Sequence, residues 1–349
     1  MYQEKIGKYS FETGIYRPPS EGGSYSLLIR VTRNCPWNRC TFCSMYKTEK
    51  FEIREPEDVK QDIDSIAGVC EELITASEQL GFGGQINRRA VLEMIDREPL
   101  LGSSHGFLMI LNWLNSGGKT VFIQDGNSLQ LNTKKMVDIL KHLRKTFPSI
   151  NRVTTYARSK TLSNKSLEEL ISIREAGLDR LHVGLETGDD ELLKKTKKGV
   201  TGAEHIDAGK KAMEAGFQLS EYWMPGLGGK AKWQDHAVNT AKVMNEISPH
   251  YIRSRPFNPA PNTPIGDEYQ RGELQLLTPE EQLDELQLMM ETLNFNSRVC
   301  FDHAGNRWTN RRGTNLFSLS YEGYKFPEEK QVVLDLIEEG KIALHHSLN

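Results

Sequence analysis

The sequence predicts an α/β fold in which six β/α units form an open, partial (β/α)6 TIM-like barrel. Three observations carry this prediction. Apolar, strand-like runs recur about every 30 residues between residues 119 and 255, and a helical pattern follows each run. A further strand-like run at residues 26–32 precedes a helical pattern near residues 56–80. Cysteines, glycines and charged residues gather directly after these runs, where the loops of such a barrel carry functional groups.

Each strand is expected from a short apolar run that is rich in β-branched and aromatic residues. The first run is residues 26–32. The other five runs are residues 119–125, 152–158, 180–186, 218–224 and 251–255. Six right-handed parallel units can curl into an open partial barrel, and its chemistry would lie on the loops after the C-termini of the strands.

Capping signals mark several helices. Thr201 and Glu204 have the spacing of a capping box, and so do Ser166 and Glu169. Thr278 precedes a proline and two glutamates, which is typical of a helix start. These signals place helices between the predicted strands and one more helix after the last of them.

The predicted domain organisation has three parts. They are an N-terminal extension, a core barrel and a C-terminal extension packed over the barrel mouth, at residues 1–23, 24–265 and 266–349. A helical insertion at residues 71–117 interrupts the core before the second strand. Within the insertion, the glycine-rich residues 81–84 and 102–106 are expected to form loops between helices.

Composition narrows the class of protein. A net charge of −3 and a pI near 6.3 provide no overall attraction to nucleic acid or to an anionic membrane. No apolar run approaches the ~20 residues that a membrane helix needs. The start of the chain lacks an apolar leader, so a reducing cytoplasm is expected. We interpret the basic runs at residues 88–89, 194–198 and 311–312 as solvated surface.

Three cysteines in one short run carry the functional signal. Cys35, Cys40 and Cys43 follow the first predicted strand and have no fourth cysteine nearby. A [4Fe–4S] cluster normally takes four thiolates, so three would leave one iron open. A structural zinc site would need a fourth ligand at regular spacing and remains the alternative. Cys70 and Cys300 are interpreted as isolated core thiols.

With these cysteines on the loop after the first strand, the chain resembles the radical SAM superfamily. The usual motif spaces its cysteines by three and two residues, with an aromatic before the last; here the second spacing and Phe42 match, whereas the first spacing is four. Residues 183–199 resemble the fourth-strand signature of the branch that contains Elp3-type, methylthiotransferase and oxygen-independent coproporphyrinogen oxidase-like enzymes. Residues 216–229 resemble its fifth-strand region. The resemblance covers about residues 24–265.

The resemblance implies a [4Fe–4S] cluster held by Cys35, Cys40 and Cys43. Its open iron would bind the amino and carboxylate groups of S-adenosylmethionine (SAM). One electron from a low-potential donor such as flavodoxin or ferredoxin would cleave SAM to a 5′-deoxyadenosyl radical. That radical would abstract hydrogen from a small organic substrate. The protein would tune the cluster by burial and by hydrogen bonds to sulfur.

The resemblance also assigns contacts to SAM. The backbone at Phe42 would meet the adenine. Asp125, Gly126 and Asn127 occupy the place of the family's Gly-Gly-Glu stretch, which receives the amino group, but only one glycine remains here. A strand-ending Asp-Gly turn is the alternative. Tyr156, near the end of the third strand, is a further candidate contact.

Four more residues complete the predicted SAM site. Arg158 suits the carboxylate because a guanidinium offers fixed charge and bidentate geometry, and an exposed loop arginine is the alternative. Glu186 suits the ribose hydroxyls or the amino group, since a buried unpaired carboxylate would be costly. Met224 and Pro225 resemble the turn beneath the adenine. Candidates for the substrate pocket, with structural roles as the alternative, are Tyr222, Arg253, Arg255, Asp302 and His303.

The residues that surround the predicted core favour a compact enzyme with one cluster. No stretch of domain length precedes the cysteines, so we expect no cobalamin-binding domain. Two spare thiols are too few for a second cluster of the methylthiotransferase type. Two alternatives remain open. One is radical modification of a peptide, a protein or RNA, and the other is a non-catalytic iron–sulfur or zinc protein.

Overall fold

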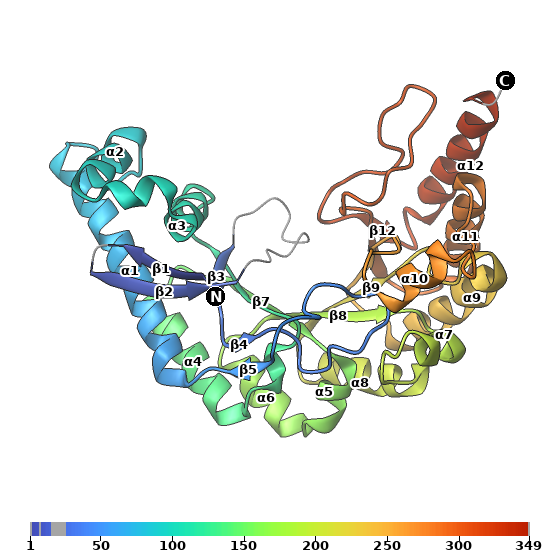
Figure 1. The fold of residues 1–349 in the computed structure, drawn as a ribbon, viewed down its shortest axis with the longest axis horizontal. Helices are drawn as coiled ribbons and strands as arrows, with labels where there is room; N and C mark the ends of the chain where they lie inside the picture. Colours follow the sequence, from blue (N-terminus) through green and yellow to red (C-terminus); the bar gives the residue numbers. More distant parts are fainter. Residues whose placement is uncertain (1, 7, 15–25, 348–349) are drawn as a thin grey trace. The chain divides into compact units, whose positions relative to one another are not determined.

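The computed structural model describes residues 2–6, 8–14 and 26–347 (Figure 1). The chain divides into two compact units. The first consists of Met1–Pro36, Lys50–Tyr156 and Glu168–Arg180, and the second of Trp37–Glu49, Ala157–Leu167 and Leu181–Asn349. This division runs through the predicted core, and the predicted boundary at residues 23 and 24 lies outside the described residues. The predicted domain boundaries therefore stay predictions.

The first unit contains three parallel strands in the order β3, β6, β7. Leu27 of β3 lies opposite Val121 of β6, which lies opposite Val153 of β7. The strands are β3 (Leu27–Ile29), β6 (Thr120–Ile123) and β7 (Arg152–Ala157). Two antiparallel pairs accompany them: β1 (Tyr2–Ile6) with β2 (Tyr9–Thr13), and β4 (Thr32–Arg33) with β5 (Glu52–Ile53).

The helices of the first unit follow the strands as β/α units require. They are α1 (Pro56–Gln79), α2 (Arg88–Arg97), η1 (Pro99–Ser103), α3 (His105–Asn115), η2 (Ser128–Gln130), α4 (Thr133–Thr146) and α6 (Leu167–Glu175). The α1 helix carries one buried stripe, including Val59, Ile63 and Ile66, and packs against α4 and β2. Its apolar residues recur at helical spacing, which is why this stretch forms a surface helix.

One of the two loops predicted in the helical insertion is confirmed. Residues 81–84 connect α1 and α2, and Gly81 there has a φ of +81°. The loop predicted at residues 102–106 is wrong, because Ser104 caps α3 by accepting from the Phe107 N–H at 3.0 Å. Gly106 therefore lies in the first turn of α3, where a Cβ would come within 2.7 Å of the Phe11 ring. This glycine permits close packing rather than a turn.

The second unit contains five strands in the order β8, β9, β10, β11, β12. Register pairs show that β9, β10 and β11 are parallel and that β12 is antiparallel to β11. The strands are β8 (Arg180–Glu186), β9 (Gln218–Trp223), β10 (Tyr251–Ser254), β11 (Ser297–Cys300) and β12 (Tyr324–Phe326). The α/β class with a parallel sheet is thus confirmed, and all six predicted strands are present.

One helix of the second unit begins with the predicted capping box, at Thr201 with Glu204. Another begins at the predicted start Thr278, which also forms a capping box with Glu281. The helices are α5 (Ser159–Asn164), α7 (Asp190–Lys195), α8 (Gly202–Glu214), α9 (Gly229–Ile247), α10 (Pro264–Gln270), α11 (Pro279–Thr292) and α12 (Lys330–Ser347). The α11 helix packs against both α9 and α12 (Figure 1). The strands β11 and β12 lie within the predicted C-terminal extension, so this extension adds two strands to the sheet.

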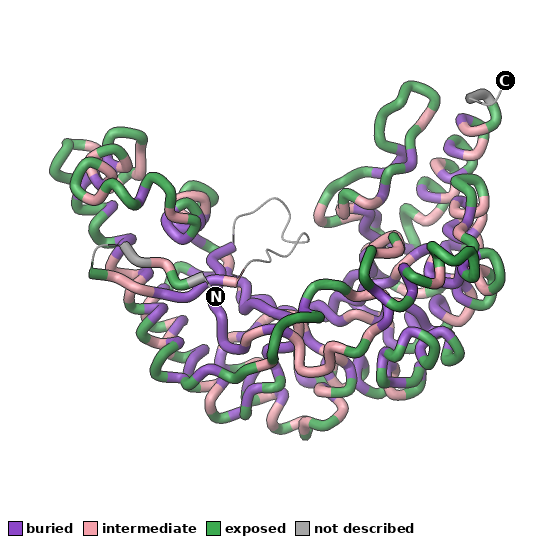
Figure 2. Tube along the Cα trace, viewed as in Figure 1, coloured by how far each residue is buried: buried purple, intermediate pink, exposed green. Residues whose placement is uncertain are grey.

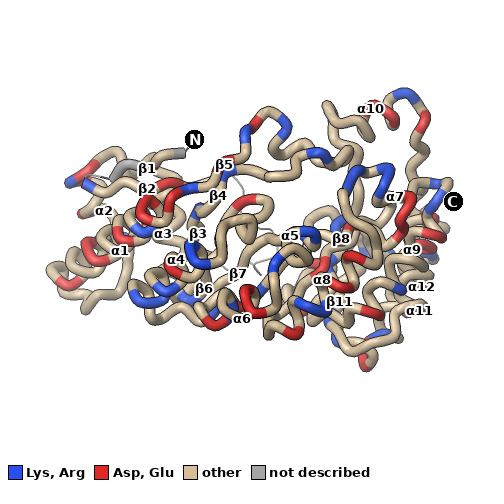
Figure 3. Tube along the Cα trace, turned by 90° about the horizontal axis from the view of Figure 1, so that it is seen from below, with Lys and Arg blue, Asp and Glu red and all other residues tan. Residues whose placement is uncertain are grey.

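Burial follows the strands. Each of the parallel strands consists largely of buried residues (Figure 2), as expected when helices cover a parallel sheet. Basic and acidic residues are interspersed along the helices (Figure 3). Among the described helices, none combines the length and the apolar character that crossing a membrane requires.

Candidate functional site

Cys40 and Cys43 lie in a loop of the second unit that backbone hydrogen bonds hold on two sides. The N–H of Thr41 donates to the carbonyl of Thr196 at 2.9 Å, and the N–H of Ile265 donates to the carbonyl of Thr41 at 3.3 Å. Within the loop, the N–H of Cys43 donates to the carbonyl of Cys40 at 3.3 Å. The position of these two cysteines is therefore set by contacts with segments distant in sequence.

Two cations lie near the Cys40 thiol. Burial raises the pKa of Cys40, and the charges of Lys198 and Arg158 act in the opposite direction. The Arg158 guanidinium donates to the carbonyl of Lys198 at 2.5 Å and lies 4.8 Å from the centre of the Trp37 ring. A nearby cation favours the thiolate, which is the form of cysteine that binds metals. Arg158 is thus part of the cysteine loop's surroundings rather than an exposed loop arginine.

Glu186, at the end of β8, forms an ion pair with Lys198. The Nζ of Lys198 lies 2.8 Å from Oε1 of Glu186, and the two side chains are only 9% and 15% exposed. Glu186 has a φ of +66°, a conformation that is rare for a residue with a long side chain. Gly184 makes room for the pair, because a Cβ there would lie 2.1 Å from Oε1 of Glu186.

Lys198 corrects one sequence interpretation. The basic run at residues 194–198 was expected to be solvated, and Lys194, Lys195 and Lys197 are indeed exposed. Lys198 is 7% exposed and lies 5.9 Å from the centre of the Phe42 ring. The interpretation fails for this residue because the carboxylate of Glu186 compensates its buried charge.

The turn after β9 lies against the end of β8. The N–H of Met224 donates to the carbonyl of Glu186 at 2.9 Å. Met224 and Phe42 both pack on a small apolar cluster of Leu227, Ile265 and Leu274. The second unit thus brings together six of the predicted site residues: Cys40, Phe42, Cys43, Arg158, Glu186 and Met224. Pro225 follows Met224 in the same turn, and its carbonyl accepts from the Phe257 N–H at 2.8 Å.

The remaining predicted cofactor residues belong to the first unit: Cys35, Asp125, Gly126, Asn127 and Tyr156. Asp125 has a φ of +73°, and its Oδ2 lies 2.6 Å from Nε of Arg30. This carboxylate is therefore engaged by a guanidinium, and its predicted contact with an amino group stays a prediction. Asn127 is fully buried, and the Tyr156 ring packs edge to face on Phe122 with centroids 5.1 Å apart.

A buried charge network lies at the entry to the cysteine run in the first unit. Glu12 of β2 lies within 3.0 Å of Arg30, 2.7 Å of Arg33 and 3.5 Å of Arg54. Burial acts to raise the pKa of Glu12, but the three guanidinium groups outweigh it, and the pKa lies below its ordinary value. Because Arg33 is two residues before Cys35, this network anchors the start of the cysteine run.

Two of the five substrate-pocket candidates form a buried ion pair. Nη1 of Arg253 lies 3.1 Å from Oδ2 of Asp302, and Nε of Arg253 donates to the Ser220 hydroxyl at 3.1 Å. The guanidinium stacks on Tyr321 at 4.1 Å and on Tyr251 at 4.9 Å from the ring centres. With no exposed surface, Arg253 of β10 contacts Ser220 of β9 and the loop residues Asp302 and Tyr321. Its predicted contact with substrate stays a prediction.

The other three candidates gather near this pair. The Arg255 guanidinium lies 4.5 Å from the centre of the Tyr222 ring. Burial and the charge of Arg255 lower the pKa of His303 to about 4, against the opposing effect of Asp302. His182 of β8, which the sequence analysis missed, stacks on Tyr222 with centroids 5.2 Å apart. His182 alternates with residues 184 and 186 along the strand, so the three residues lie on the same face of β8. This period of two is the sequence signal that could have identified His182.

Glu221 of β9 is a second residue that sequence reasoning missed. It is 1% exposed, and burial raises its pKa well above the ordinary value, with Lys198 opposing and Glu186 reinforcing that shift. No sequence signal distinguishes it from the apolar residues on either side of it in the strand.

The thiols fit an iron–sulfur site by their chemistry. None of the five cysteines forms a disulfide; Cys35, Cys40 and Cys43 are partly exposed, whereas Cys70 and Cys300 are buried. Burial raises the pKa of each of the last two to about 12, which suits inert core thiols. The described residues contain no group of three or more His, Cys, Asp or Glu side chains arranged to hold a metal ion. Ligation by the three cysteines stays a prediction.

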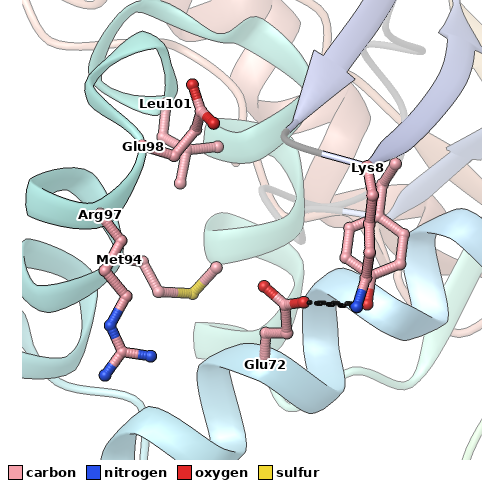
Figure 4. Close-up of a pocket in the computed structure, with 7 residues that line it drawn as sticks. Lys8, Glu72, Met94, Arg97, Glu98 and Leu101 are labelled. Carbon is pink, nitrogen blue, oxygen red and sulfur yellow. Dashed lines mark hydrogen bonds and ion pairs between the residues drawn. The ribbon is translucent and has the colours of Figure 1, made fainter.

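A cavity of about 180 Å³ in the first unit holds none of the predicted site residues. Its walls carry an ion pair between Lys8 and Glu72, 3.2 Å apart, and its apolar part is formed by Met94 and Leu101 (Figure 4). Lys8 is 73% exposed, and a charged rim of this kind is ordinary solvated surface.

Parts of the chain are similar to known proteins. Residues 108–236 match the model of the radical SAM superfamily. The chain is 26% identical over 178 residues to the heme chaperone HemW of Bacillus subtilis (strain 168), covering 50% of this chain and 46% of that protein. It is 24% identical over 168 residues to the tRNA-2-methylthio-N(6)-dimethylallyladenosine synthase of Ehrlichia canis (strain Jake), covering 48% and 36%. These alignments span less than half of either relative.

Coproporphyrinogen III oxidase (HemN) from Escherichia coli is similar with a TM-score of 0.47 and 16% identity, covering 76% of this chain and 51% of that chain.

Proposed function

We propose, on the premise that the chain carries a radical SAM domain at residues 108–236, that it is an enzyme holding a [4Fe–4S] cluster and SAM. Cys35, Cys40 and Cys43 would ligate the cluster. The substrate would be a small organic molecule that loses a hydrogen atom. One observation carries the proposal: the second unit places the Cys40 loop beside Arg158, Lys198 and the Glu186 ion pair.

When bound, the cluster and SAM supply a 5′-deoxyadenosyl radical that abstracts the hydrogen. The chain's own residues would bind and orient SAM. Arg158 offers a fixed positive charge for the carboxylate of SAM. Lys198 holds Glu186 at the strand end, where a carboxylate would meet ribose hydroxyls or the amino group. Phe42 and Met224 offer apolar surface for the adenine, since both pack on the cluster of Leu227, Ile265 and Leu274.

The polar residues beyond the SAM site would face the substrate. Tyr222, Arg255 and His303 lie together there, and His303 is uncharged at neutral pH. An uncharged imidazole can both donate and accept a hydrogen bond, which suits an uncharged polar group on the substrate. We assign the reductant to a low-potential carrier such as flavodoxin or ferredoxin, and the location to the cytoplasm, where free thiols persist.

Iron content and SAM cleavage test this proposal. Anaerobically reconstituted protein should contain about four irons per chain, as a [4Fe–4S] cluster requires, and should form 5′-deoxyadenosine with a reductant. Cys40→Ala should abolish both, because it removes a ligand. Cys70→Ala is the matched control: it removes a buried thiol of α1 and should leave iron and cleavage intact. Protein that holds only zinc, or a cluster that never cleaves SAM, contradicts the proposal.

A non-catalytic role is the second candidate, because the relative with the higher identity is called a heme chaperone. Such a role predicts that added heme binds with a visible absorption band and that reductant yields no 5′-deoxyadenosine. The same reconstituted sample therefore decides between the two functions.

A further inference from the structure

In the second unit, a pair of buried polar residues on α9 and α11 contacts the loops that follow β8 and β9. His236 of α9 and Glu285 of α11 are both fully buried, and Oε1 of Glu285 lies 3.9 Å from Nε2 of His236. Neither residue was singled out by the sequence, where they lie 49 residues apart. Buried ionisable side chains are costly unless hydrogen bonds satisfy them, so their contacts indicate what they do.

His236 joins two loops that follow different strands. Its Nε2 lies 3.0 Å from the carbonyl oxygen of Met224, and its Nδ1 lies 2.8 Å from the hydroxyl of Thr187. A carbonyl can only accept, so Nε2 carries the proton and Nδ1 accepts from the hydroxyl. Burial lowers the pKa of His236 to about 4, against the effects of the Met224 carbonyl and of Asp189, so the ring is neutral. One side chain thus sets the spacing of both loops.

Glu285 contacts the same turn two residues after Met224, at Gly226. Its Oε2 accepts from the N–H of Gly226 at 2.6 Å. Gly226 has a φ of +86°. Glycine can adopt this and several other backbone conformations. The hydrogen bond from Glu285 therefore selects one conformation of Gly226. Burial raises the pKa of Glu285 to about 8, against the effect of the Gly226 N–H. The carboxyl is therefore mostly protonated at pH 7.

The pair acts on residues that the proposed function uses. Met224 and Gly226 belong to the turn that would lie against the adenine. Thr187 directly follows Glu186, and the N–H of Met224 donates to the carbonyl of Glu186 at 2.9 Å. Thr240, one turn after His236 in α9, accepts from the N–H of Gly188 at 2.9 Å. The backbone that follows Glu186 is thus held by two residues of α9, His236 and Thr240.

We propose that His236 and Glu285 are positioning residues for SAM, which hold the loops after β8 and β9 in the geometry that receives its adenosyl group. This inference rests on the proposed function. The pair would touch neither SAM nor the substrate, and would act through Thr187, Met224 and Gly226.

Equilibrium binding of S-adenosylhomocysteine to reconstituted protein tests the inference without turnover. His236→Phe fills the same space but removes both hydrogen bonds, and should weaken binding at least tenfold with unchanged iron content. Asn245→Ala is the matched control. It removes hydrogen bonds from α9 to the Thr292 carbonyl and to the Asn294 N–H, away from the site. It should lower stability and leave affinity within twofold of wild type.

Variants of Glu285 provide a second measurement, which does not depend on whether the His236→Phe protein folds. Glu285→Gln keeps a neutral acceptor for Gly226 and should bind S-adenosylhomocysteine within twofold of wild type at pH 7, whereas Glu285→Ala should lose at least tenfold. The raised pKa means that the stabilisation from Glu285 is fully present below its ordinary value of 4.5 and is lost as pH rises through about 8. Between pH 5 and pH 9 the melting temperature should therefore fall more for wild type than for Glu285→Gln.

The possible binding results distinguish a failure of the proposed function from a failure of the inference about His236 and Glu285. If wild type does not bind S-adenosylhomocysteine, the proposed function fails and the inference falls with it. If wild type binds, and His236→Phe and Glu285→Ala bind as tightly as Asn245→Ala, the inference alone is overturned. A tenfold loss confined to His236→Phe and Glu285→Ala, with rescue by Glu285→Gln, supports it.

Discussion

Replacing Gly184 by alanine should separate the Glu186–Lys198 ion pair while leaving β8 folded. The new Cβ would lie 2.1 Å from Oε1 of Glu186 and 2.9 Å from Nζ of Lys198, both closer than real Cβ contacts. Both atoms are at the ends of flexible side chains, so the pair can yield without a backbone shift. Inserting a methyl into such a site costs about 1–3 kcal/mol of unfolding free energy.

The effect on binding follows from the same geometry. If Glu186 meets SAM, displacing its carboxylate should weaken S-adenosylhomocysteine binding about tenfold, which corresponds to 1.4 kcal/mol. Urea denaturation and equilibrium dialysis measure the two effects separately. Gly102→Ala is the matched control, because its nearest neighbour would be Ile95 at 3.8 Å, an ordinary contact. A Gly184→Ala protein as stable and as tightly binding as Gly102→Ala would refute the reasoning.

Two further predictions concern buried charges. Arg253→Met should lower the free energy of unfolding by about 3–5 kcal/mol, because it leaves Asp302 buried without its partner; Arg271→Met, which removes an exposed pair, should cost less than about 1 kcal/mol in the same urea titration. Glu12→Gln should destabilise the protein at pH 7. The lowered pKa means that the contribution of Glu12 is present above 4.5 and lost as pH falls through the folded value, so the difference from wild type should shrink between pH 5 and pH 3. A difference that stays constant over that range contradicts the ion-pair account.

The β/α succession was predictable because its signals are local. An apolar strand run and a helical period are read from neighbouring residues, and all six expected strands are present. The capping box at Thr201 and the helix start at Thr278 were predictable for the same reason. The loop expected around Gly106 failed because glycine has two uses, and close packing against Phe11 cannot be distinguished from a turn in the sequence alone.

The candidate site was predictable in part. A predicted strand ends at or shortly before each of Cys40, Phe42, Arg158, Glu186 and Met224, so their convergence in the second unit could be expected from topology. Their partners could not. Arg253 was expected in a substrate pocket because it is a polar residue on a predicted strand. The structure stacks it on Tyr251 and Tyr321 and pairs it with Asp302, and no local pattern in the sequence indicates these partners.

The sequence by itself determined the order of the strands and helices, the run of three cysteines and the class of chemistry that such a run supports, because each depends on residues close in the chain. Only the tertiary structure decided which charged groups are buried and with what partner. Lys198 lies in a basic run yet pairs with Glu186, and His236 and Glu285 are polar residues in helices yet hold the turn of Met224. Burial and pairing depend on segments that folding brings together, and no local pattern records them.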